Sequence, residues 1–366
     1  MTAFSFRKLM DIIKNTEKQI AAHTAENGML PEGCGIVAGV SGGADSLCML
    51  LALVSLYGKE HRICAVHVNH NIRTEAAEDE AYVKKICMER DIPFLSCSVD
   101  VAARAAGDGI SSEEAGRRLR YEAFDDAVKR LAEGRFPGVA EKVPVSRICV
   151  AHTMDDNAET MLLNLFRGTG LKGLAGIPAM RGNVVRPLLV ISREMTEGYL
   201  NAQGIPYCTD ITNEGDDYTR NRIRHKLLPA AKECINERAM EHMNETSLQL
   251  SEAEDFISEV IAEKYTEMIT EKDDGIYIRR KEFRELHPYI AKRLLLKAME
   301  RTCGRARDIS SVHMNALYGL FSKGRGKRLD LPYFITASVK DRYVVLSVDT
   351  EKELGKNKMR SGGSKG

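Results

Sequence analysis

The sequence predicts an α/β protein: a Rossmann-like parallel sheet covered by helices, followed by a second, α-rich domain. In the first half of the chain, short and continuously apolar segments alternate with amphipathic helical segments. This pattern is typical of a parallel sheet that is buried on both faces. From about residue 229 the alternation stops and long charged helical segments follow. A length of 366 residues also exceeds one typical domain.

The predicted elements follow one another regularly. We expect buried strands at 35–40, 62–68, 93–99 and 147–151, and helices at 46–57, 75–90, 112–131 and 155–166. Residues 133–146 are predicted to form a surface loop. Beyond them we expect long helices over 230–270 and short strands near 275–278, 328–331, 334–339 and 343–348. The predicted domains are 1–228 and 229–350, with a polar, disordered tail at 351–366.

Composition excludes several classes of protein. A hydrophobic content of 43% and a charged content of 29% are those of a soluble globular chain. The apolar runs are too short to span a bilayer, and the N-terminal segment lacks the apolar core of a signal peptide. None of the nine cysteines forms a CxxC pair, which indicates reduced thiols in a cytoplasmic protein. With a net charge of +1, any contact with nucleic acid must depend on local basic clusters.

The most informative segment is the turn Ser41-Gly42-Gly43-Ala44-Asp45-Ser46, which follows a predicted strand and opens a predicted helix. Two consecutive glycines allow positive φ and close approach to an anion. The N–H groups and dipole of a helix N-terminus favour negative charge. The Gly-Lys-Ser/Thr of an ordinary P-loop is missing. The turn resembles the pyrophosphate-binding SGGxDS loop of enzymes that cleave ATP between its α and β phosphates.

A second motif places Asp155 and Asp156 in the first turn of a helix at the end of a strand, with Glu159 one turn later and His152 before them. Helix capping needs only one such carboxylate. Placed opposite a phosphate loop, the carboxylates could hold Mg²⁺ or bind a cationic amino acid. A zinc site built from His67, His70 and His152 is the weaker alternative, because the ligand spacing of such a site is missing.

Basic residues cluster in several places. Arg117 lies in a helical segment with Arg120 and Tyr121, and could stabilise charge on a breaking phosphate bond or simply face solvent. Residues 220–226 hold five basic residues in seven positions, with Tyr218 nearby for stacking. Further clusters lie at 279–281 and 323–328. Together they favour contact with an RNA backbone.

Seven motifs in order resemble the tRNA(Ile)-lysidine synthetases, RNA-modifying enzymes of the ATP-pyrophosphatase group. They are SGGADS (41–46), AVHVNHNIR (65–73), SSEEAGRRLRY (111–121), HTMDDNAET (152–160), LLNLFRGTGLKGLAGI (162–177), RPLL (186–189) and DITN with YTRNRIR (210–224). The resemblance covers residues 35–229 and implies an adenine nucleotide alpha hydrolase-like sheet, in agreement with the strand and helix pattern.

The resemblance implies a reaction. Free lysine is ligated to C2 of the first anticodon cytidine of an isoleucine tRNA with a CAU anticodon, which switches codon reading from AUG to AUA. ATP first adenylates the C2 oxygen and releases pyrophosphate, and the lysine ε-amine then displaces AMP. The implied cofactors are ATP and Mg²⁺, and the implied partners are this tRNA and L-lysine, without a membrane. A homodimer is compatible with the sequence.

The resemblance also implies roles for individual residues. ATP phosphates would be held by the loop residues Ser41, Gly42, Gly43, Ala44, Asp45 and Ser46, with Asp45 also near Mg²⁺. Arg117 would stabilise the adenylation step. Asp155 and Asp156 would bind metal or the ammonium groups of lysine and help to deprotonate the ε-amine, and the sequence does not decide which does which. The residues that would contact tRNA are Arg220, Arg222, Arg224 and Lys226, together with the domain at 229–350.

Two departures and two alternatives remain. Gly116 stands where the family usually has Ala, and Asn157 where it often has Gln. Larger members carry a further C-terminal domain, which is not evident here. A tRNA thiolase of the same group would share the loop but would typically need cysteines for sulfur transfer or an iron–sulfur cluster. A non-catalytic RNA-binding module would keep the basic clusters but could lose Asp155 and Asp156, and both are present.

Overall fold

A computed structural model describes residues 3–70, 76–208, 219–304 and 309–348 of the chain. The chain divides into two compact units, Met1–Ser251 and Glu252–Gly366. This division falls within one long helix, α11 (Ala239–Met268). The predicted domain boundary after residue 228 and the predicted tail at 351–366, which lies outside the described residues, stay predictions.

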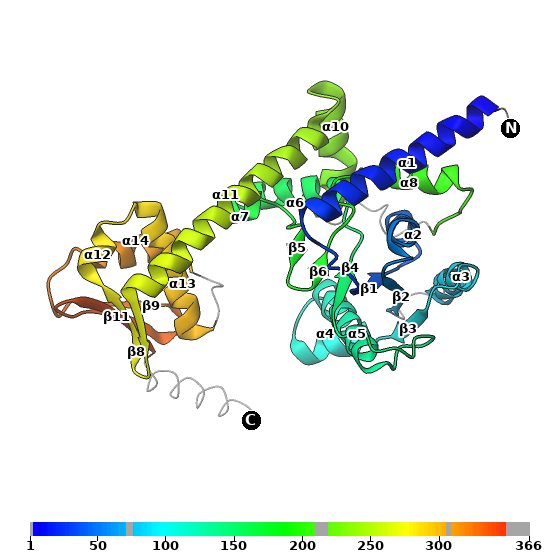
Figure 1. The fold of residues 1–366 in the computed structure, drawn as a ribbon. Coiled ribbons are helices and arrows are strands. Elements are labelled where there is room, and N and C mark those ends of the chain that lie inside the picture. Colours follow the sequence, from blue (N-terminus) through cyan, green and yellow to red (C-terminus); the bar gives the residue numbers. More distant parts are fainter. Residues whose placement is uncertain (1–2, 71–75, 209–218, 305–308, 349–366) are drawn as a thin grey trace, which may run out of the picture. The chain divides into compact units, whose positions relative to one another are not determined.

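The first unit contains a six-stranded sheet of order β3-β2-β1-β4-β6-β5 (Figure 1). β3, β2, β1, β4 and β6 run parallel, and β5 is antiparallel to β6. The strands are β1 (Gly35–Gly39), β2 (Arg62–Asn69), β3 (Phe94–Ser98), β4 (Ser146–Cys149), β5 (Met180–Arg181) and β6 (Val184–Val185). The predicted fold class is confirmed, and the short edge pair β5–β6 is an addition that the sequence did not indicate.

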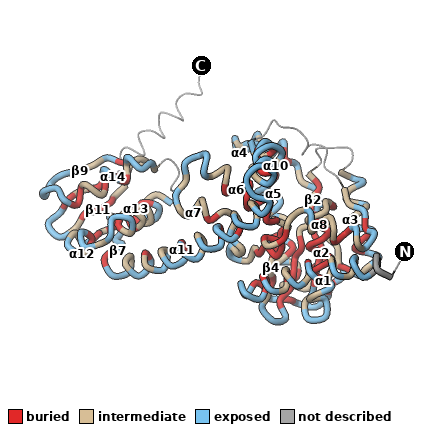
Figure 2. The backbone as a smooth tube through the Cα atoms, turned by 90° about the horizontal axis from the view of Figure 1, so that it is seen from above, coloured by how far each residue is buried: buried red, intermediate tan, exposed pale blue. Residues whose placement is uncertain are grey.

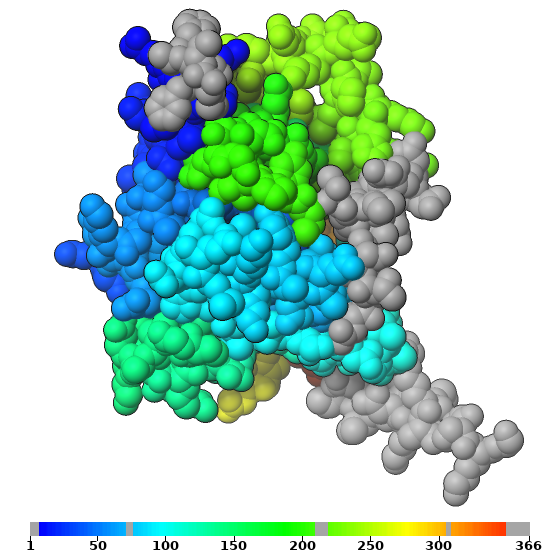
Figure 3. Space-filling view, turned by 90° about the vertical axis from the view of Figure 1, so that its right-hand side faces the viewer, coloured from blue at the N-terminus to red at the C-terminus, as the bar shows by residue number. Residues whose placement is uncertain are grey.

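Helices cover both faces of this sheet. On β1, Ile36 and Ala38 pack into one buried cluster and Val37 into the other, as the alternation of side chains along a strand requires. The first cluster lies against α2, which is apolar around most of its circumference and contacts α1 and α8. Figure 2 shows this concentration of buried backbone at α2 and the strands, and Figure 3 shows the α8 segment in green beside α1 in blue.

The helices of the first unit have the following bounds: α1 (Ala3–Glu26), α2 (Ala44–Tyr57), α3 (Ala76–Met88), α4 (Val101–Asp108), α5 (Ser112–Glu133), α6 (Met154–Phe166), α7 (Leu171–Leu174), α8 (Arg193–Ala202), α9 (Thr219–Arg222) and α10 (Leu228–Cys234). A short π-helix at Ile223–Leu227 joins α9 to α10. None of the helices described in the structure is long and apolar enough to cross a membrane.

The second unit contains an antiparallel sheet of order β7-β8-β11-β10-β9 with helices packed on it. Its core joins Ile278, Phe283, Leu294 and Leu346. The elements are β7 (Ile269–Lys272), β8 (Gly275–Arg279), α12 (Arg280–Arg284), α13 (Pro288–Cys303), α14 (Ser311–Leu320), β9 (Arg328–Leu331), a 3-10 turn at Pro332–Phe334, β10 (Ile335–Val339) and β11 (Tyr343–Val348).

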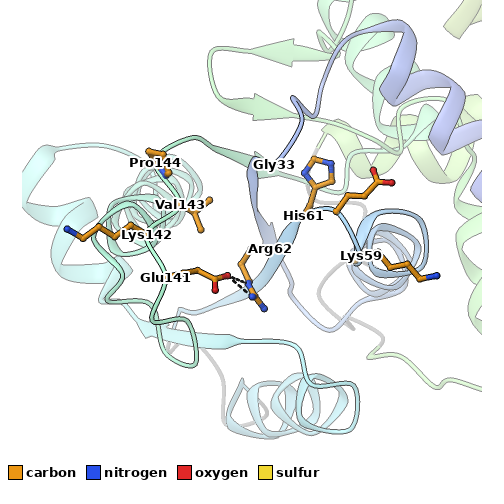
Figure 4. A pocket seen from close by; sticks show the side chains of 10 residues that line it. Gly33, Lys59, His61, Arg62, Glu141, Lys142, Val143 and Pro144 are labelled. Atoms are coloured by element: carbon orange, nitrogen blue, oxygen red, sulfur yellow. Dashed lines mark hydrogen bonds and ion pairs between the residues drawn. The ribbon is translucent and has the colours of Figure 1, made fainter.

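A polar pocket of about 390 Å³ lies where β1, β2 and β4 begin, and its lining includes His61, Arg62 and Glu141 (Figure 4). Arg62 and Glu141 form an ion pair of 2.5 Å across it. In parallel sheets ligands bind at the opposite edge, where the strands end. The pocket is therefore distinct from the site described next.

Candidate active site

The loop between β1 and α2 lies at the carboxyl edge of the sheet. Gly42 has a φ of +95°, which side chains with a Cβ rarely adopt. A Cβ on Gly39 would lie 2.4 Å from Phe124 Cζ, so only glycine fits where β1 meets α5. Gly43 is the N-cap of α2 and makes no side-chain capping hydrogen bond. The first-turn N–H groups of α2 therefore lack a side-chain cap, as an anion site requires.

Two hydroxyl groups shape this loop. Ser46 Oγ accepts a hydrogen bond from the Ser41 amide at 3.1 Å and donates to the Gly43 carbonyl at 3.0 Å. Ser41 Oγ lies 3.2 Å from Ser46 Oγ. Ser46 is buried, whereas Ser41 is exposed. Ser46 thus maintains the conformation of the loop, and Ser41 carries the accessible hydroxyl.

Asp45, the second residue of α2, is bound to α8. Its Oδ1 accepts a hydrogen bond from Thr196 Oγ1 at 2.6 Å, and its Oδ2 lies 3.5 Å from Arg193 Nε. Burial raises the pKa of Asp45, while Thr196 and Arg193 oppose this shift and the charge of Asp156 reinforces it. The carboxylate is therefore partly desolvated and lies in the same turn as the N–H groups of α2 that lack a side-chain cap.

At the start of α6, Thr153 and Asp156 form a capping box. Asp156 Oδ2 accepts a hydrogen bond from the Thr153 amide at 2.9 Å. Its Oδ1 faces three guanidinium groups, at 3.6 Å from Arg193, 3.3 Å from Arg220 and 3.4 Å from Arg224. Burial alone would raise the pKa of Asp156, but the Thr153 amide and the charges of Arg193 and Arg220 hold it below its usual value. Asp156 thus stays ionised in a largely dry environment.

Glu159 completes this acidic pair one turn later. It is fully buried, and its Oε atoms accept hydrogen bonds from Arg220 Nε at 2.7 Å and Arg224 Nε at 2.5 Å. The sequence places Glu159 in the acidic motif but gives it no separate role. A carboxylate three residues after Asp156 shares its helix face.

Asp155 has a different partner. Its Oδ2 accepts a hydrogen bond from the backbone amide of Arg193 at 2.8 Å, in the first turn of α8. Ser192 Oγ caps the same turn by accepting from the Met195 amide. Asp155 thus fixes α8, while Asp156 faces the arginines. The two adjacent aspartates, which the sequence could not distinguish, have separate surroundings.

Arg117 lies on α5 with its guanidinium carbon 5.3 Å from the ring centre of Tyr121. Its charge acts on His152, which precedes α6. Burial lowers the pKa of His152, the charge of Asp156 opposes this shift, and the nearby arginines reinforce it. Within the described part of the chain, His152 Nδ1 is buried without a hydrogen-bond partner. The charge of Arg117 therefore helps to keep the His152 imidazole neutral at the residue that precedes α6.

The basic segment 220–226 divides by environment. Arg220 and Arg224 bind Asp156 and Glu159, as described above, and their side chains are 39% and 22% exposed. Arg222 and Lys226 are exposed, and Arg222 also contacts Thr219 Oγ1 at 3.2 Å. The preceding residues 209–218, which include the DITN motif and Tyr218, lie outside the described residues.

Asn157 connects α6 to α11 through a buried polar network. Its Nδ2 donates to Asn244 Oδ1 at 2.9 Å and to Ser247 Oγ at 3.0 Å, and its Oδ1 accepts from the Ile177 amide at 2.7 Å. A Cβ on Gly176 would lie 2.1 Å from Asn157 Oδ1. The motif at 162–177 thus supplies a turn that packs against the helix carrying Asp155 and Asp156.

The described residues contain no cluster of three or more His, Cys, Asp and Glu side chains arranged to hold a metal ion. His67 Nδ1 lies 2.9 Å from the Val40 carbonyl, and His70 Nε2 lies 3.3 Å from Arg120. The zinc alternative therefore has no support in the geometry. A Mg²⁺ ion would fit here if one carboxylate, such as that of Asp45, supplied a ligand and if phosphate oxygens and water supplied the others.

Known proteins resemble this chain over most of its length. The PP-loop domain family matches residues 13–231. The chain is 34% identical to a tRNA(Ile)-lysidine synthase of Caldanaerobacter subterraneus subsp. tengcongensis over 88% of this chain and 67% of that protein. It is 33% identical to the tRNA(Ile)-lysidine synthase of Clostridioides difficile over 88% and 68%, respectively. The chain thus spans about two thirds of the length of these curated relatives.

A solved U34-tRNA thiolase, NcsA from Methanococcus maripaludis, aligns with a TM-score of 0.50 over 66% of this chain and 79% of that one, at 16% identity. At this identity the likeness concerns the fold alone. Fold, nucleotide loop and family match together define a PP-loop enzyme that uses ATP. The extent and identity of the matches go further: the chain belongs to the tRNA(Ile)-lysidine synthase family of ATP-dependent ligases. The predicted family, enzyme class and use of ATP are confirmed.

Proposed function

We propose that the chain ligates free lysine to C2 of the first anticodon cytidine of an isoleucine tRNA with a CAU anticodon. One observation carries the proposal for these residues. Asp45 of the nucleotide loop and Asp156 of α6 lie within 3.6 Å of the same guanidinium, that of Arg193. An anion-binding turn and an acidic pair therefore meet at one edge of the sheet, where a nucleotide and a cationic amino acid can bind side by side.

In the first step the cytosine C2 oxygen forms a bond to the α-phosphorus of ATP. The bond from the α-phosphorus to the α–β bridging oxygen breaks, and pyrophosphate leaves with the electron pair. We assign phosphate binding to the loop residues 41–46 and stabilisation of the developing charge to Arg117. Mg²⁺, held by Asp45 and the phosphates, would neutralise further negative charge. The target base must leave its stack to reach these groups.

In the second step the ε-amine of lysine attacks C2, the C2–O bond breaks, and AMP leaves with that oxygen. The amine must be neutral to attack, so it loses one proton before and one after C–N bond formation. We assign the binding of lysine ammonium groups to Asp156, with Glu159 beside it, because both are ionisable carboxyl groups on one face of α6. Asp155 would act through α8, whose first amide it binds.

For the tRNA we propose separate roles within residues 220–226. Arg222 and Lys226, which are exposed, would contact the phosphate backbone. Arg220 and Arg224 are bound to the acidic pair Asp156 and Glu159, so they would contact only RNA that lies next to this pair.

A loop in the second unit supports a further contact with RNA. Lys323, Lys327 and Arg328 border a cavity of about 490 Å³ beside α14. Arg280 donates to the Lys323 carbonyl at 2.5 Å and Arg284 to the Phe321 carbonyl at 2.9 Å, which fixes the start of this loop. A fixed loop with three cations is suited to a phosphate backbone.

The thiol groups argue against sulfur transfer. Burial raises the pKa of Cys64 and of Cys208 to about 12, and it raises that of Cys149 further. The thiolate is the reactive form of cysteine, so these side chains are poor sulfur carriers at neutral pH. The proposed cytoplasmic location agrees with nine cysteines for which the structure records no disulfide among described residues.

The proposal is tested by incorporation of radiolabelled lysine into an unmodified isoleucine tRNA transcript with a CAU anticodon, with methionine tRNA as the control. We expect ATP-dependent labelling of the isoleucine tRNA alone. Labelling of both would support the chemistry but place discrimination outside this chain. ATP cleavage to AMP without labelling would contradict lysine as the nucleophile and favour a thiolase. Light scattering of the same preparation tests whether the chain forms a homodimer.

A further inference from the structure

The first turn of α8 is bound to both halves of the proposed site. Thr196 Oγ1 donates to Asp45 at 2.6 Å, and the Arg193 amide donates to Asp155 at 2.8 Å. These two hydrogen bonds attach α8 to the nucleotide loop and to α6 without any contribution from the Arg193 guanidinium. The guanidinium is therefore not needed to hold α8 in place.

The guanidinium itself lies between two carboxylates. Its Nε is 3.5 Å from Asp45 and its Nη2 is 3.6 Å from Asp156. Charge-assisted N–H···O bonds are typically about 2.7–2.9 Å long, so neither carboxylate holds the group at its optimum. The side chain is 28% exposed. A cation in this position can exchange its partners at little cost.

We propose that Arg193 binds the phosphate groups of ATP and compensates the charge that collects on the departing pyrophosphate. Asp45 belongs to the first turn of α2, where the loop presents its N–H groups, so a cation beside Asp45 is also beside the anion site. A guanidinium can donate two parallel N–H bonds to one phosphate group, whereas here it approaches each carboxylate through a single nitrogen at 3.5 Å or more. This role deepens the proposed function and rests on it for the identity of the reaction.

The other arginines near Asp156 are placed differently. Arg220 and Arg224 each make a hydrogen bond to Glu159 of 2.7 Å or shorter. Arg117 lies against Tyr121. Of these four guanidinium groups, Arg193 is the one that the structure places in contact with the nucleotide loop, although the sequence had indicated Arg117 for phosphate chemistry.

The test is equilibrium binding of a non-hydrolysable ATP analogue and, separately, of lysine, measured by calorimetry on the full chain. The variants are Arg193→Met and Arg193→Lys, with Glu194→Gln as the matched control. Glu194 is the next residue on α8, has an 87% exposed side chain and lies 3.8 Å from Lys232. We expect Arg193→Met to weaken binding of the analogue at least tenfold without weakening lysine, because removal of a cation does not disfavour an ammonium group. Arg193→Lys should restore part of the affinity, and Glu194→Gln should bind like the wild type.

The proposal is overturned if Arg193→Met binds the analogue as the wild type does. It is also overturned if the variant loses analogue and lysine together with a fall in Tm, because that result indicates a structural role. Should Arg193→Met fail to fold, Arg193→Lys decides: an unchanged affinity would contradict phosphate recognition by a planar fork. Wild-type protein that binds the analogue but not lysine would refute the proposed function, while the comparison of analogue affinities would still decide the role of Arg193.

Discussion

At the scale of single residues, the least expected group is the fully buried carboxylate of Glu159 between Arg220 and Arg224. A buried charge without a partner is strongly unfavourable, so the carboxylate and the two guanidinium groups depend on one another. This explains why Arg220 and Arg224, to which the resemblance gives contact with tRNA, also lie against α6.

Replacing Glu159 with Gln should lower the free energy of unfolding by about 2–3 kcal/mol, below the full cost of breaking a buried pair because both arginines are partly exposed. Urea denaturation measures the loss. Glu122→Gln is the control, since Glu122 is 56% exposed in its pair with Arg104. We expect the control to change stability by less than about 1 kcal/mol. Equal stability of the Glu159 variant and the wild type would show that the two arginines do not depend on the Glu159 carboxylate.

His152 should make stability depend on pH. Burial lowers its pKa below the usual 6.5, so the unfolded state binds a proton that the folded state does not as the pH falls below 6.5. Stability is therefore lost as the pH falls through this range and is regained as it rises. Replacement of His152 by Gln should flatten that part of the stability–pH curve, measured by Tm between pH 7 and 5. An unaltered slope would mean that other groups, such as His70, carry the effect.

At the scale of elements, glycines decide where helices and strands can approach one another. Gly39 ends β1 against Phe124 of α5 and has no room for a Cβ. Gly116 lies inside α5, and a Cβ there would be 3.7 Å from His70 Cε1, at ordinary van der Waals distance. The departure from the family's usual Ala at 116 is therefore compatible with the packing.

Alanine substitutions at Gly39 and Gly116 should change the stability of the protein in opposite directions. Gly116→Ala should stabilise the protein by about 0.5–1 kcal/mol, because alanine loses less backbone entropy in a helix. Gly39→Ala should destabilise it, because the new Cβ would collide with the Phe124 ring. Thermal unfolding of the two variants is the measurement. A fall in Tm for Gly116→Ala would show that His70 cannot accept the added methyl group.

At the scale of the whole molecule, the two units have different chemistry. The first holds the nucleotide loop, the acidic pair and their arginines, and the second presents a fixed loop with Lys323, Lys327 and Arg328. A net charge of +1 over the chain conceals these local concentrations of positive charge. Binding of tRNA should therefore depend on a few clusters and not on the overall charge.

The double variant Arg222→Ala, Lys226→Ala should weaken tRNA binding and reduce the slope of log affinity against log salt by about 1–2 in magnitude. The reason is that fewer counterions are released from the RNA when fewer phosphate contacts form. Filter binding over a range of salt concentrations measures both quantities. Lys129→Ala is the control, because Lys129 is an exposed residue of α5. If affinity and slope both remain as in the wild type, the RNA-binding surface lies elsewhere.

Much of the catalytic unit could be predicted from local patterns. The strand, the Ser-Gly-Gly turn and the helix start were evident because each depends on a few adjacent residues: apolar runs, glycines that allow positive φ, and carboxylates in a first helical turn. The polar motifs follow the ends of predicted parallel strands, and such ends lie at one edge of a sheet, so a common site could be predicted there. The five strands of the second unit were recognised only in part, because β7 follows α11 without an interruption.

The sequence by itself determined the fold class, the nucleotide loop and the family, since these follow from contiguous motifs. Tertiary structure alone decided which charges meet. Arg220 and Arg224 reach Glu159 from 61 and 65 positions away, and Arg193 reaches Asp45 from 148 positions away. Such pairings depend on how α8 and the α9 region pack against α2 and α6. A charged residue has the same local pattern whether it faces solvent, RNA or a buried carboxylate, so only its folded surroundings distinguish these cases.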